Sequence, residues 1–600
     1  MRFFAHPATV GAVALVACSS PTPPLGSTGS STASGGSVSS GGTTASGGAP
    51  TAGASGNPAS GGAAVQPEDD CALPPAGPVQ FSVPSGTFEG SVTVALTTSE
   101  PDAEIRYTTD RTPPTVASPL YGEPLTFTLS TELRAQAFVN GAPVGAPQAA
   151  VYVARAFDAE HDLPIIVLDA YGVDGGTGGS GGGSTGGSFP FPGQSSADRE
   201  WKNAAVMTFE PDGALASLSE APTMASTAAY HLRGQSSALY EKKPYRLEVR
   251  DALGDDRDCP MLGMPSESDW VLHPPYPDKA LIRNAFVYSL GPELGLAAPR
   301  FAFAELYLNT KARPLESSDY QGVYLLVETI KNQKHRLDLK QLEPEDTTLP
   351  TISGGYIFKL EWRVTSIEQE LVCPDTTLYC WDSLEIADPE PVNAEQEAYL
   401  AGFLGQLGLA LHYATPSDPE TGYPALIDTA SFVNQVIVHE LSRNIDAYTR
   451  SQYFYKDRNG KLFAGPLWDY DVIAGVGSSS GFPNLAIEGF QYDSVASRFS
   501  STADWFPRLI ADPVFHAALV ARWKELRAGV LSDAEITARI TRLTEGLAAA
   551  AERNFQRWDN LTTRRVGVFD TPTHATWEAQ VAGMRDWLIA RAAWLDTQWQ

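Results

Sequence analysis

Apolar and polar residues alternate in short stretches between residues 77 and 155. Such alternation is typical of strands with one buried face, because successive side chains of a strand point to opposite faces of the sheet. The expected strands are 91–96, 103–108, 125–129 and 132–138. We therefore expect a small antiparallel β-sandwich in this part of the chain.

Beyond residue 160 the apolar residues form longer runs and then recur at helical spacing. The runs predict strands at 164–168, 204–209, 244–249, 303–308 and 322–330, and the helical spacing predicts helices at 280–294, 393–411 and 430–444. The turn signal Asp457-Arg-Asn-Gly460 predicts a hairpin between 453–455 and 461–464. From residue 513 onwards the pattern is mainly helical. The sequence thus predicts an α+β fold with a β-rich first half and a helical second half.

The N-terminus has the pattern of a secretory signal peptide over residues 1–18, with a basic start and an apolar run. Its ending, Leu15-Val-Ala-Cys18, resembles the lipobox of bacterial lipoproteins. We expect an exported protein anchored at the outer membrane or cell surface, attached to the membrane only through lipid at Cys18. An ordinary cleaved signal with a chance cysteine is the alternative.

Two segments have a low-complexity composition. Residues 19–70 are mostly Ser, Gly, Thr, Ala and Pro, which cannot bury enough apolar surface to offset the entropy of ordering, so a flexible stalk is expected. A Gly/Ser tract at 175–187 has no lysine after it and is predicted to be a surface loop rather than a phosphate-binding loop. The domains expected are therefore the signal peptide, the stalk, a sandwich over 71–155 and a larger domain over 156–600.

Charge and cysteine content narrow the range of functions. The 600 residues carry 42 Lys and Arg against 70 Asp and Glu, a net charge of −28, which excludes a dedicated nucleic-acid binder. Of the five cysteines, four remain after Cys18, an even number that suggests disulfides in an exported protein. Cys373 and Cys380 are the obvious local pair, and Cys71 with Cys259 follows only by elimination. A zinc site lacks the required Cys-x-x-Cys or histidine cluster.

Three acidic residues stand out as candidate chemistry. Asp446 follows a predicted helix, and Asp469 and Asp471 follow the predicted hairpin, whose two ends must lie close together. An extended backbone would put Asp469 and Asp471 on the same side. Converging carboxylates suit a proton acceptor beside a metal ligand, as phosphoryl transfer requires. A solvated acidic turn is the alternative.

Several motifs carry a resemblance to known families. Residues 103–121 resemble the immunoglobulin-like C-terminal domain of chitobiase and β-hexosaminidase, an accessory module.

The larger domain resembles the spore-coat protein H (CotH) kinase family in motifs that follow one another in the expected order: Arg233-Gly-Gln-Ser-Ser237, Lys242-Lys-Pro-Tyr-Arg246, Asp269-Trp270, 278–284, 322–330, 354–357, Asn444-Ile-Asp446 and Trp468-Asp-Tyr-Asp471.

The resemblance implies an atypical protein-kinase-like fold that uses ATP with Mg²⁺ or Mn²⁺ to phosphorylate Ser or Thr hydroxyls of exported proteins. By position, Asp446 matches the catalytic acid and Asp469 the metal-binding acid, with Asp471 and Asn444 as further metal ligands. The candidates for contacts with the nucleotide are Lys242 or Lys243, Arg233, Arg283 and Glu328. The alternatives are that Arg283 caps its helix and that Glu328 is a buried structural partner of Arg336.

Two departures from classical protein kinases keep other functions open. Ser451 stands where those enzymes have a metal-binding Asn, and no glycine-rich phosphate loop has the usual spacing. A catalytically inactive surface adhesin or scaffold is therefore one alternative. A carbohydrate-active enzyme is another, because paired carboxylates could also serve glycoside hydrolysis.

Overall fold

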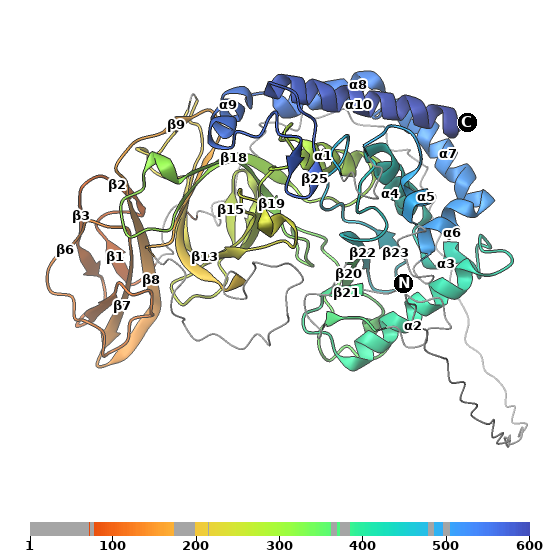
Figure 1. The fold of residues 1–600 in the computed structure, drawn as a ribbon. Helices are drawn as coiled ribbons and strands as arrows, with labels where there is room; N and C mark the ends of the chain where they lie inside the picture. The colour runs from red at the N-terminus through yellow and green to blue at the C-terminus, as the bar shows by residue number, and fades with distance from the viewer. Residues whose placement is uncertain are drawn as a thin grey trace, which may run out of the picture. The chain divides into compact units, whose positions relative to one another are not determined.

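The computed structural model describes residue 71 and residues 77–172, 199–213, 215–361, 369–372, 384–477, 485–495 and 504–600 (Figure 1). The predicted signal peptide, the stalk, the Gly/Ser tract at 175–187 and the Cys373–Cys380 pair lie outside these residues. Across the described segments, no helix combines the length and the apolar character needed to span a bilayer.

The first part is an all-β module built on one four-stranded sheet in the order β2 (Gly86–Phe88), β8 (Ala142–Ala154), β7 (Thr131–Val139), β5 (Glu104–Thr108). Two strand pairs accompany it: β1 (Val79–Phe81) with β4 (Leu96–Thr98), and β3 (Val92–Val94) with β6 (Leu125–Phe127). Their inward side chains, among them Val94, Leu133 and Tyr152, form one hydrophobic core. Three of the strands expected from alternation are present as β5, β6 and β7. The expected strand 91–96 is divided between β3 and β4, and the β2–β8 pair is parallel rather than antiparallel.

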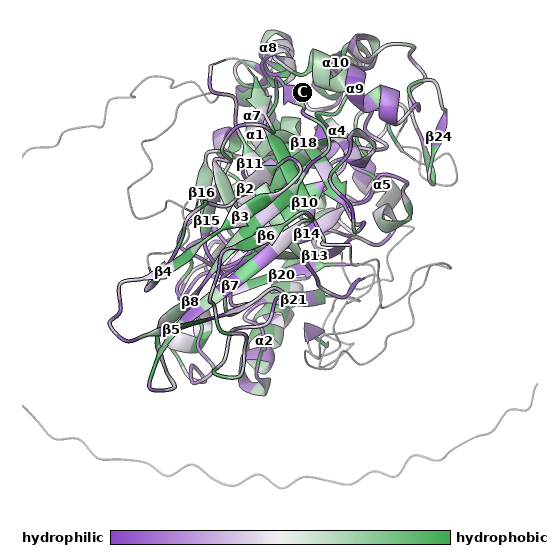
Figure 2. Ribbon diagram, turned by 90° about the vertical axis from the view of Figure 1, so that its left-hand side faces the viewer, coloured by the Kyte–Doolittle hydropathy of each residue, from purple (hydrophilic) through white to green (hydrophobic). Residues whose placement is uncertain are grey.

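A closed seven-stranded barrel follows, in which every strand has two neighbours. Around the barrel the order is β10 (Ile165–Asp169), β11 (Lys202–Phe209), β13 (Met224–Leu232), β14 (Tyr245–Arg250), β17 (Asp269–His273), β19 (Tyr320–Glu328), β18 (Phe301–Asn309). The parallel pair β10–β18 closes it, and the other pairs are antiparallel. In Figure 2 the strands at the β10 and β18 labels have hydrophobic colours.

Alternation along β19 shows how the barrel joins the rest of the domain. Tyr324 and Leu326 belong to the same core as Trp270, while Val323, Leu325 and Val327 belong to the core of the helical half. A strand with both faces buried lacks a polar face, which is why residues 322–330 read as a nearly continuous apolar run.

The second half combines helices with a four-stranded sheet, β21 (Leu384–Asp388), β20 (Tyr356–Leu360), β22 (Gln452–Lys456), β23 (Leu462–Ala464). The hairpin β22–β23 has the predicted turn. The helices are α1 (Arg283–Leu294), α2 (Ala394–Leu411), α3 (Tyr423–Leu426), α4 (Thr429–Ser442), α5 (Gln491–Val495), α6 (Trp505–Ala511), α7 (Pro513–Arg527), α8 (Asp533–Thr544), α9 (Ala548–Arg557) and α10 (Trp577–Gln598). The α+β prediction, β-rich first and helical second, is confirmed.

Short two-stranded pairs complete the architecture: β9 (Glu160–His161) with β12 (Ala216–Ser217), β15 (Cys259–Met261) with β16 (Met264–Glu267), and β24 (Arg565–Val566) with β25 (Phe569–Asp570). The last pair interrupts the helical C-terminal region. It is joined to Gly477 by two backbone hydrogen bonds with Asp570, of 3.0 and 2.6 Å.

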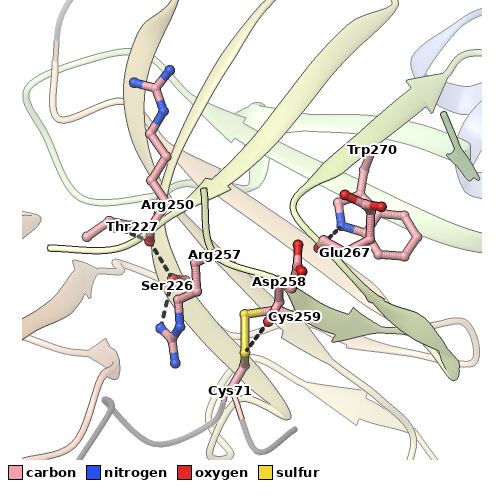
Figure 3. The surroundings of a disulfide bond; sticks show 9 residues. All are labelled: Cys71, Ser226, Thr227, Arg250, Arg257, Asp258, Cys259, Glu267 and Trp270. Atoms are coloured by element: carbon pink, nitrogen blue, oxygen red, sulfur yellow. Dashed lines mark hydrogen bonds between the residues drawn. A yellow bond between two sulfur atoms is a disulfide. The ribbon is translucent and has the colours of Figure 1, made fainter. Parts of the chain in front are cut away.

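The β-module is fastened to the barrel at several points. A disulfide links Cys71, ahead of the module, to Cys259 on β15, which confirms the pairing reached by elimination (Figure 3). Ser130 donates a hydrogen bond to the buried carboxylate of Asp169 on β10 (2.8 Å), and Arg134 donates to the Ala252 carbonyl (2.8 Å). The module is therefore held by covalent and polar contacts in addition to chain continuity.

Candidate active site

The three acidic residues come from two loops that meet. Asp446 lies in the turn that follows α4, and Asp469 and Asp471 lie in the loop after β23. Ser451, just before β22, donates a hydrogen bond from Oγ to Oδ2 of Asp469 (3.2 Å) and so ties the two loops together. The convergence predicted from the hairpin is therefore present.

Helix α1 holds the loop that carries Asp469 and Asp471. The Tyr470 N–H donates to Oδ1 of Asn284 (2.6 Å), and the Asp469 N–H donates to the Tyr288 hydroxyl oxygen (3.2 Å). Arg283 donates to the carbonyls of Ile473 (2.9 Å) and Ala474 (3.1 Å). One helix therefore holds the backbone of this loop at four positions between residues 469 and 474.

The extended backbone expected around Tyr470 is absent. Asp469 has a positive φ of 64°, in the left-handed region, and β23 already ends at Ala464. The physical reason is visible in the contacts: the N–H groups of residues 469 and 470 turn toward α1 rather than toward a neighbouring strand.

Burial and like charge dominate the electrostatics of this loop. Desolvation raises the pKa of Asp469, although Arg233 and the hydrogen bond from Ser451 oppose the rise. Desolvation raises the pKa of Asp471 well above its usual range, and the nearby charges of Asp469, Asp278 and Asp446 add to the effect. The carboxylates thus lie close enough to repel one another.

This donor set suits a divalent cation that is shared with phosphate oxygens. Across the described segments, no group of three or more His, Cys, Asp or Glu side chains is arranged to hold a metal by itself. Mg²⁺ is usually bound through one or two carboxylates together with substrate phosphates and water, rather than by an all-protein cage. Asp469 and Asp471 are the carboxylates that would hold such a cation, whose charge would offset their mutual repulsion.

A small pocket lies beside Asp469. It is lined by Arg233, Val271, His273, Tyr288, Val327, Trp468 and Asp469, and its free volume is about 10 Å³, enough for about one water molecule. The Arg233 guanidinium lies over the Trp468 ring, 5.4 Å from its centroid. Among the cations predicted to contact the nucleotide, Arg233 is the one that lines this pocket.

The two candidate lysines point elsewhere. The Lys242 side chain is buried, with 1% of its surface exposed, and donates to the Val323 carbonyl and to Oδ1 of Asn554 on α9 (2.7 Å). Desolvation lowers its pKa well below the usual range. Lys243 donates to the Ala238 carbonyl (2.9 Å). Lys242 thus connects β19 to α9, a structural contact.

The remaining predicted residues take part in structural contacts. Arg283 forms a buried ion pair with Asp278 (2.5 Å) in addition to its bonds to the loop carbonyls. Glu328 pairs with Arg336 (2.7 Å) and Arg300 (2.6 Å), which confirms the structural partner considered for it. Asn444 is buried, and its Oδ1 accepts the Asp446 N–H (3.0 Å), so it shapes the Asp446 turn.

Two residues of the site were missed by sequence reasoning. Tyr288 lies on α1 among residues that were assigned only to an apolar helix face. His273 ends β17, lines the pocket and makes a 2.9 Å contact from Nε2 to the Asn284 amide nitrogen. Burial lowers the pKa of His273 to about 3. Its position at the end of a buried strand was the available signal.

Comparisons with known families agree with the motifs. The family model described as chitobiase/beta-hexosaminidase C-terminal domain matches residues 83–148. The family model described as CotH kinase protein matches residues 230–595, a span that includes Arg233, Asp446, Asp469 and Asp471. A comparison with curated proteins found no match. Because the second model covers more than half of the chain, the protein belongs to the CotH kinase family.

Proposed function

We propose that the chain is an exported, lipid-anchored kinase that transfers the γ-phosphate of ATP to Ser or Thr hydroxyls of exported or surface proteins and depends on a divalent cation. Family membership supports the reaction class. The observation that carries the proposal is the meeting of the Asp446 and Asp469 loops through the Ser451–Asp469 hydrogen bond.

Asp446 is suited to the role of proton acceptor. Its carboxylate is partly exposed and forms an ion pair with Arg450 (3.3 Å), so it remains accessible to an acceptor hydroxyl. In this role it orients the Ser or Thr hydroxyl and takes up its proton as the oxygen attacks the phosphoryl group. Asn444 holds the turn that presents it.

Asp469 and Asp471 are suited to hold the cation, and Arg233 to contact the phosphates. A bound Mg²⁺ or Mn²⁺ neutralises phosphate charge during transfer. Arg233 offers several N–H donors beside Asp469, and a guanidinium matches phosphate geometry well. The rigid attachment of the loop to α1 keeps the two carboxylates in place before the nucleotide binds.

The test is phosphate transfer by the full chain. Labelled ATP is incubated with the purified protein, Mn²⁺ or Mg²⁺ and a mixture of Ser/Thr-rich acceptor proteins. We expect incorporation of label, and its loss in Asp446→Ala and Asp469→Ala. Asp586→Ala, at an exposed position on α10, is the matched control and should leave labelling unchanged. Labelling that persists in both site variants would overturn the assignment.

A second candidate is a binding protein that keeps the fold without turnover. One observation favours it: the pocket beside Asp469 has a free volume of about 10 Å³, whereas small-molecule sites usually measure several hundred Å³. As described, this pocket alone is too small to hold a nucleotide.

A thermal shift separates the two candidates. A ligand that binds the native state raises its stability by RT ln(1+[L]/Kd). The kinase proposal requires a higher unfolding temperature with millimolar MgATP, and a smaller increase in Arg233→Ala. An unchanged unfolding temperature in the wild type supports the binding protein.

A further inference from the structure

His439 lies where the segments that carry the acidic residues come together. It is on the last turn of α4, the helix that leads to Asp446, and its side chain is buried, with 3% of its surface exposed. Its carbonyl accepts the N–H groups of Arg443 and Asn444, which form the turn before Asp446. The backbone of His439 therefore helps to shape the approach to Asp446.

The imidazole ring of His439 contacts both of the other segments. Its Nε2 donates to Oε1 of Gln452 (2.6 Å), the residue after Ser451. Its Nδ1 lies 3.4 Å from the hydroxyl oxygen of Tyr470, the residue between Asp469 and Asp471. The side-chain amide of Gln435, also on α4, lies 2.9 Å from both His439 Nε2 and the Tyr470 oxygen.

Aromatic rings enclose the imidazole. Tyr470 stacks on it with ring centroids 5.9 Å apart, and Tyr448 meets it edge to face at 4.8 Å. Burial lowers the pKa of His439 to about 4, so the ring is neutral near pH 7. A neutral imidazole has one donor and one acceptor, so Nε2, which donates to the Gln452 oxygen, leaves Nδ1 to accept from the Tyr470 hydroxyl. The Gln435 amide nitrogen is also a donor, and its hydrogen bond goes to the Tyr470 oxygen.

We propose that His439 is a positioning residue for the phosphoryl transfer, one that fixes the Asp446 turn, the Ser451–Gln452 segment and the Asp469–Asp471 loop relative to one another. The inference rests on the proposed function. His439 touches none of the three carboxylates in the contacts described, so it acts through its neighbours. Any buried imidazole needs hydrogen-bond partners, and here those partners belong to the two segments that carry Ser451 and the Asp469–Asp471 loop.

Three variants of the full chain test the proposal. His439→Leu removes donor and acceptor, whereas His439→Gln keeps a donor that can reach Gln452. We expect His439→Leu to lower kcat at least tenfold with KM for ATP changed less than twofold, and to raise the Mn²⁺ concentration for half-maximal activity. His439→Gln should recover most of kcat. His412→Leu, at the end of α2, is the matched histidine control and should keep wild-type kinetics.

Hydrogen–deuterium exchange provides a readout that does not depend on activity. We expect faster amide exchange in both 444–451 and 467–474 for His439→Leu, and in neither segment for His412→Leu. Faster exchange in His439→Leu, together with a wild type that transfers no phosphate, would leave the contacts assigned to His439 standing and overturn the proposed function. Unchanged exchange in both segments, or kcat retained in His439→Leu, would overturn the positioning role itself.

Discussion

Asp469 owes its left-handed backbone to a neighbour that no local pattern reveals. Its N–H donates to the Tyr288 hydroxyl oxygen, a buried acceptor on α1. Removal of the acceptor of a buried N–H group lowers the free energy of unfolding by about 1–3 kcal/mol. Here that N–H group belongs to Asp469, the residue assigned to hold the cation. Tyr288 is therefore an indirect determinant of the carboxylate position.

Replacement of Tyr288 by Phe tests this dependence. We expect the free energy of unfolding to fall by about 1–2 kcal/mol and the rate of phosphate transfer to fall roughly tenfold. Chemical denaturation and transfer assays measure the two effects. Tyr423→Phe, which removes a buried hydroxyl that donates to Asp512 (3.1 Å), is the matched control. It should lose similar stability and keep the transfer rate; equal loss of activity in both variants would argue against a specific role for Tyr288.

The raised pKa values of Asp469 and Asp471 predict a link between pH and metal binding. The folded chain binds protons at these carboxyls more tightly than the unfolded chain does. Without a cation, their contribution therefore favours folding at low pH and is lost as pH rises from about 4 through the raised pKa values. A divalent cation favours the ionised carboxylates, so stabilisation by Mn²⁺ should grow with pH.

Unfolding temperatures at about pH 5 and about pH 8, with and without millimolar Mn²⁺, measure this link. In the wild type the Mn²⁺-induced increase should be larger at the higher pH. Asp471→Asn should raise the unfolding temperature of the metal-free protein by roughly 1–3 °C and weaken the response to Mn²⁺. A response that stays the same size in Asp469→Asn and Asp471→Asn would place the cation elsewhere.

The sequence predicted that the acidic residues of this site lie close together, but it did not predict the contacts that hold their loop in place. The meeting of Asp446 and Asp469 followed from the hairpin, which is a local signal. The contacts of Asn284 and Tyr288 with the loop join residues 186 and 181 positions apart, and local periodicity carries no trace of them. For Lys242 the family resemblance suggested a possible phosphate contact, and the structure shows its side chain buried between β19 and α9.

At the level of elements, α9 is the clearest example of a long-range partnership. Asn554 on this helix accepts hydrogen bonds from Lys242 Nζ (2.7 Å) and the Val323 N–H (3.1 Å). Gly322 has φ of +86°, and a Cβ there would meet the Asn554 Oδ1 atom at 2.4 Å. The close approach of α9 to β19 therefore depends on a glycine, an asparagine and a buried lysine.

Asn554→Ala should destabilise the protein strongly. The change leaves the Lys242 ammonium and the Val323 N–H without this buried acceptor, which we expect to lower the free energy of unfolding by about 2–4 kcal/mol. Gln556→Ala on the same helix removes an exposed side chain and should change it by less than about 0.5 kcal/mol. Urea denaturation of the two variants compares them directly, and similar midpoints would contradict the role given to Asn554.

Five of the seven barrel strands were expected near their observed bounds, whereas β13, β17 and the closure of the barrel were not predicted. Strands β10 and β18 are individually apolar and were expected at nearly their observed bounds. Their parallel pairing joins Ile165 to Glu305, with several other elements between them in the chain. Parallel neighbours are not joined by a short turn with its own residue signal, so sequence periodicity shows the strands and leaves their order open.

On the scale of the whole molecule, the Cys71–Cys259 bond closes a chain segment with a sequence separation of 188. A cross-link over a loop of this length restricts the unfolded chain and is expected to contribute about 3–5 kcal/mol. We expect Cys71→Ser/Cys259→Ser to lose that amount in denaturation experiments under oxidising conditions. Full wild-type stability in the double variant would show that the polar contacts of Ser130 and Arg134 hold the module without the disulfide.

The same bond also determines how a mechanical load passes through the molecule. Cys71 precedes the module, so a pull applied at the N-terminal side of Cys71 enters β15 through the disulfide and reaches the barrel directly. The strands of the module then lie outside the line of tension. Once the disulfide is reduced, the same pull must pass through β1 to β8 before it reaches the barrel. The oxidised chain transmits force as a short rigid link, and the reduced chain would do so as an extensible one.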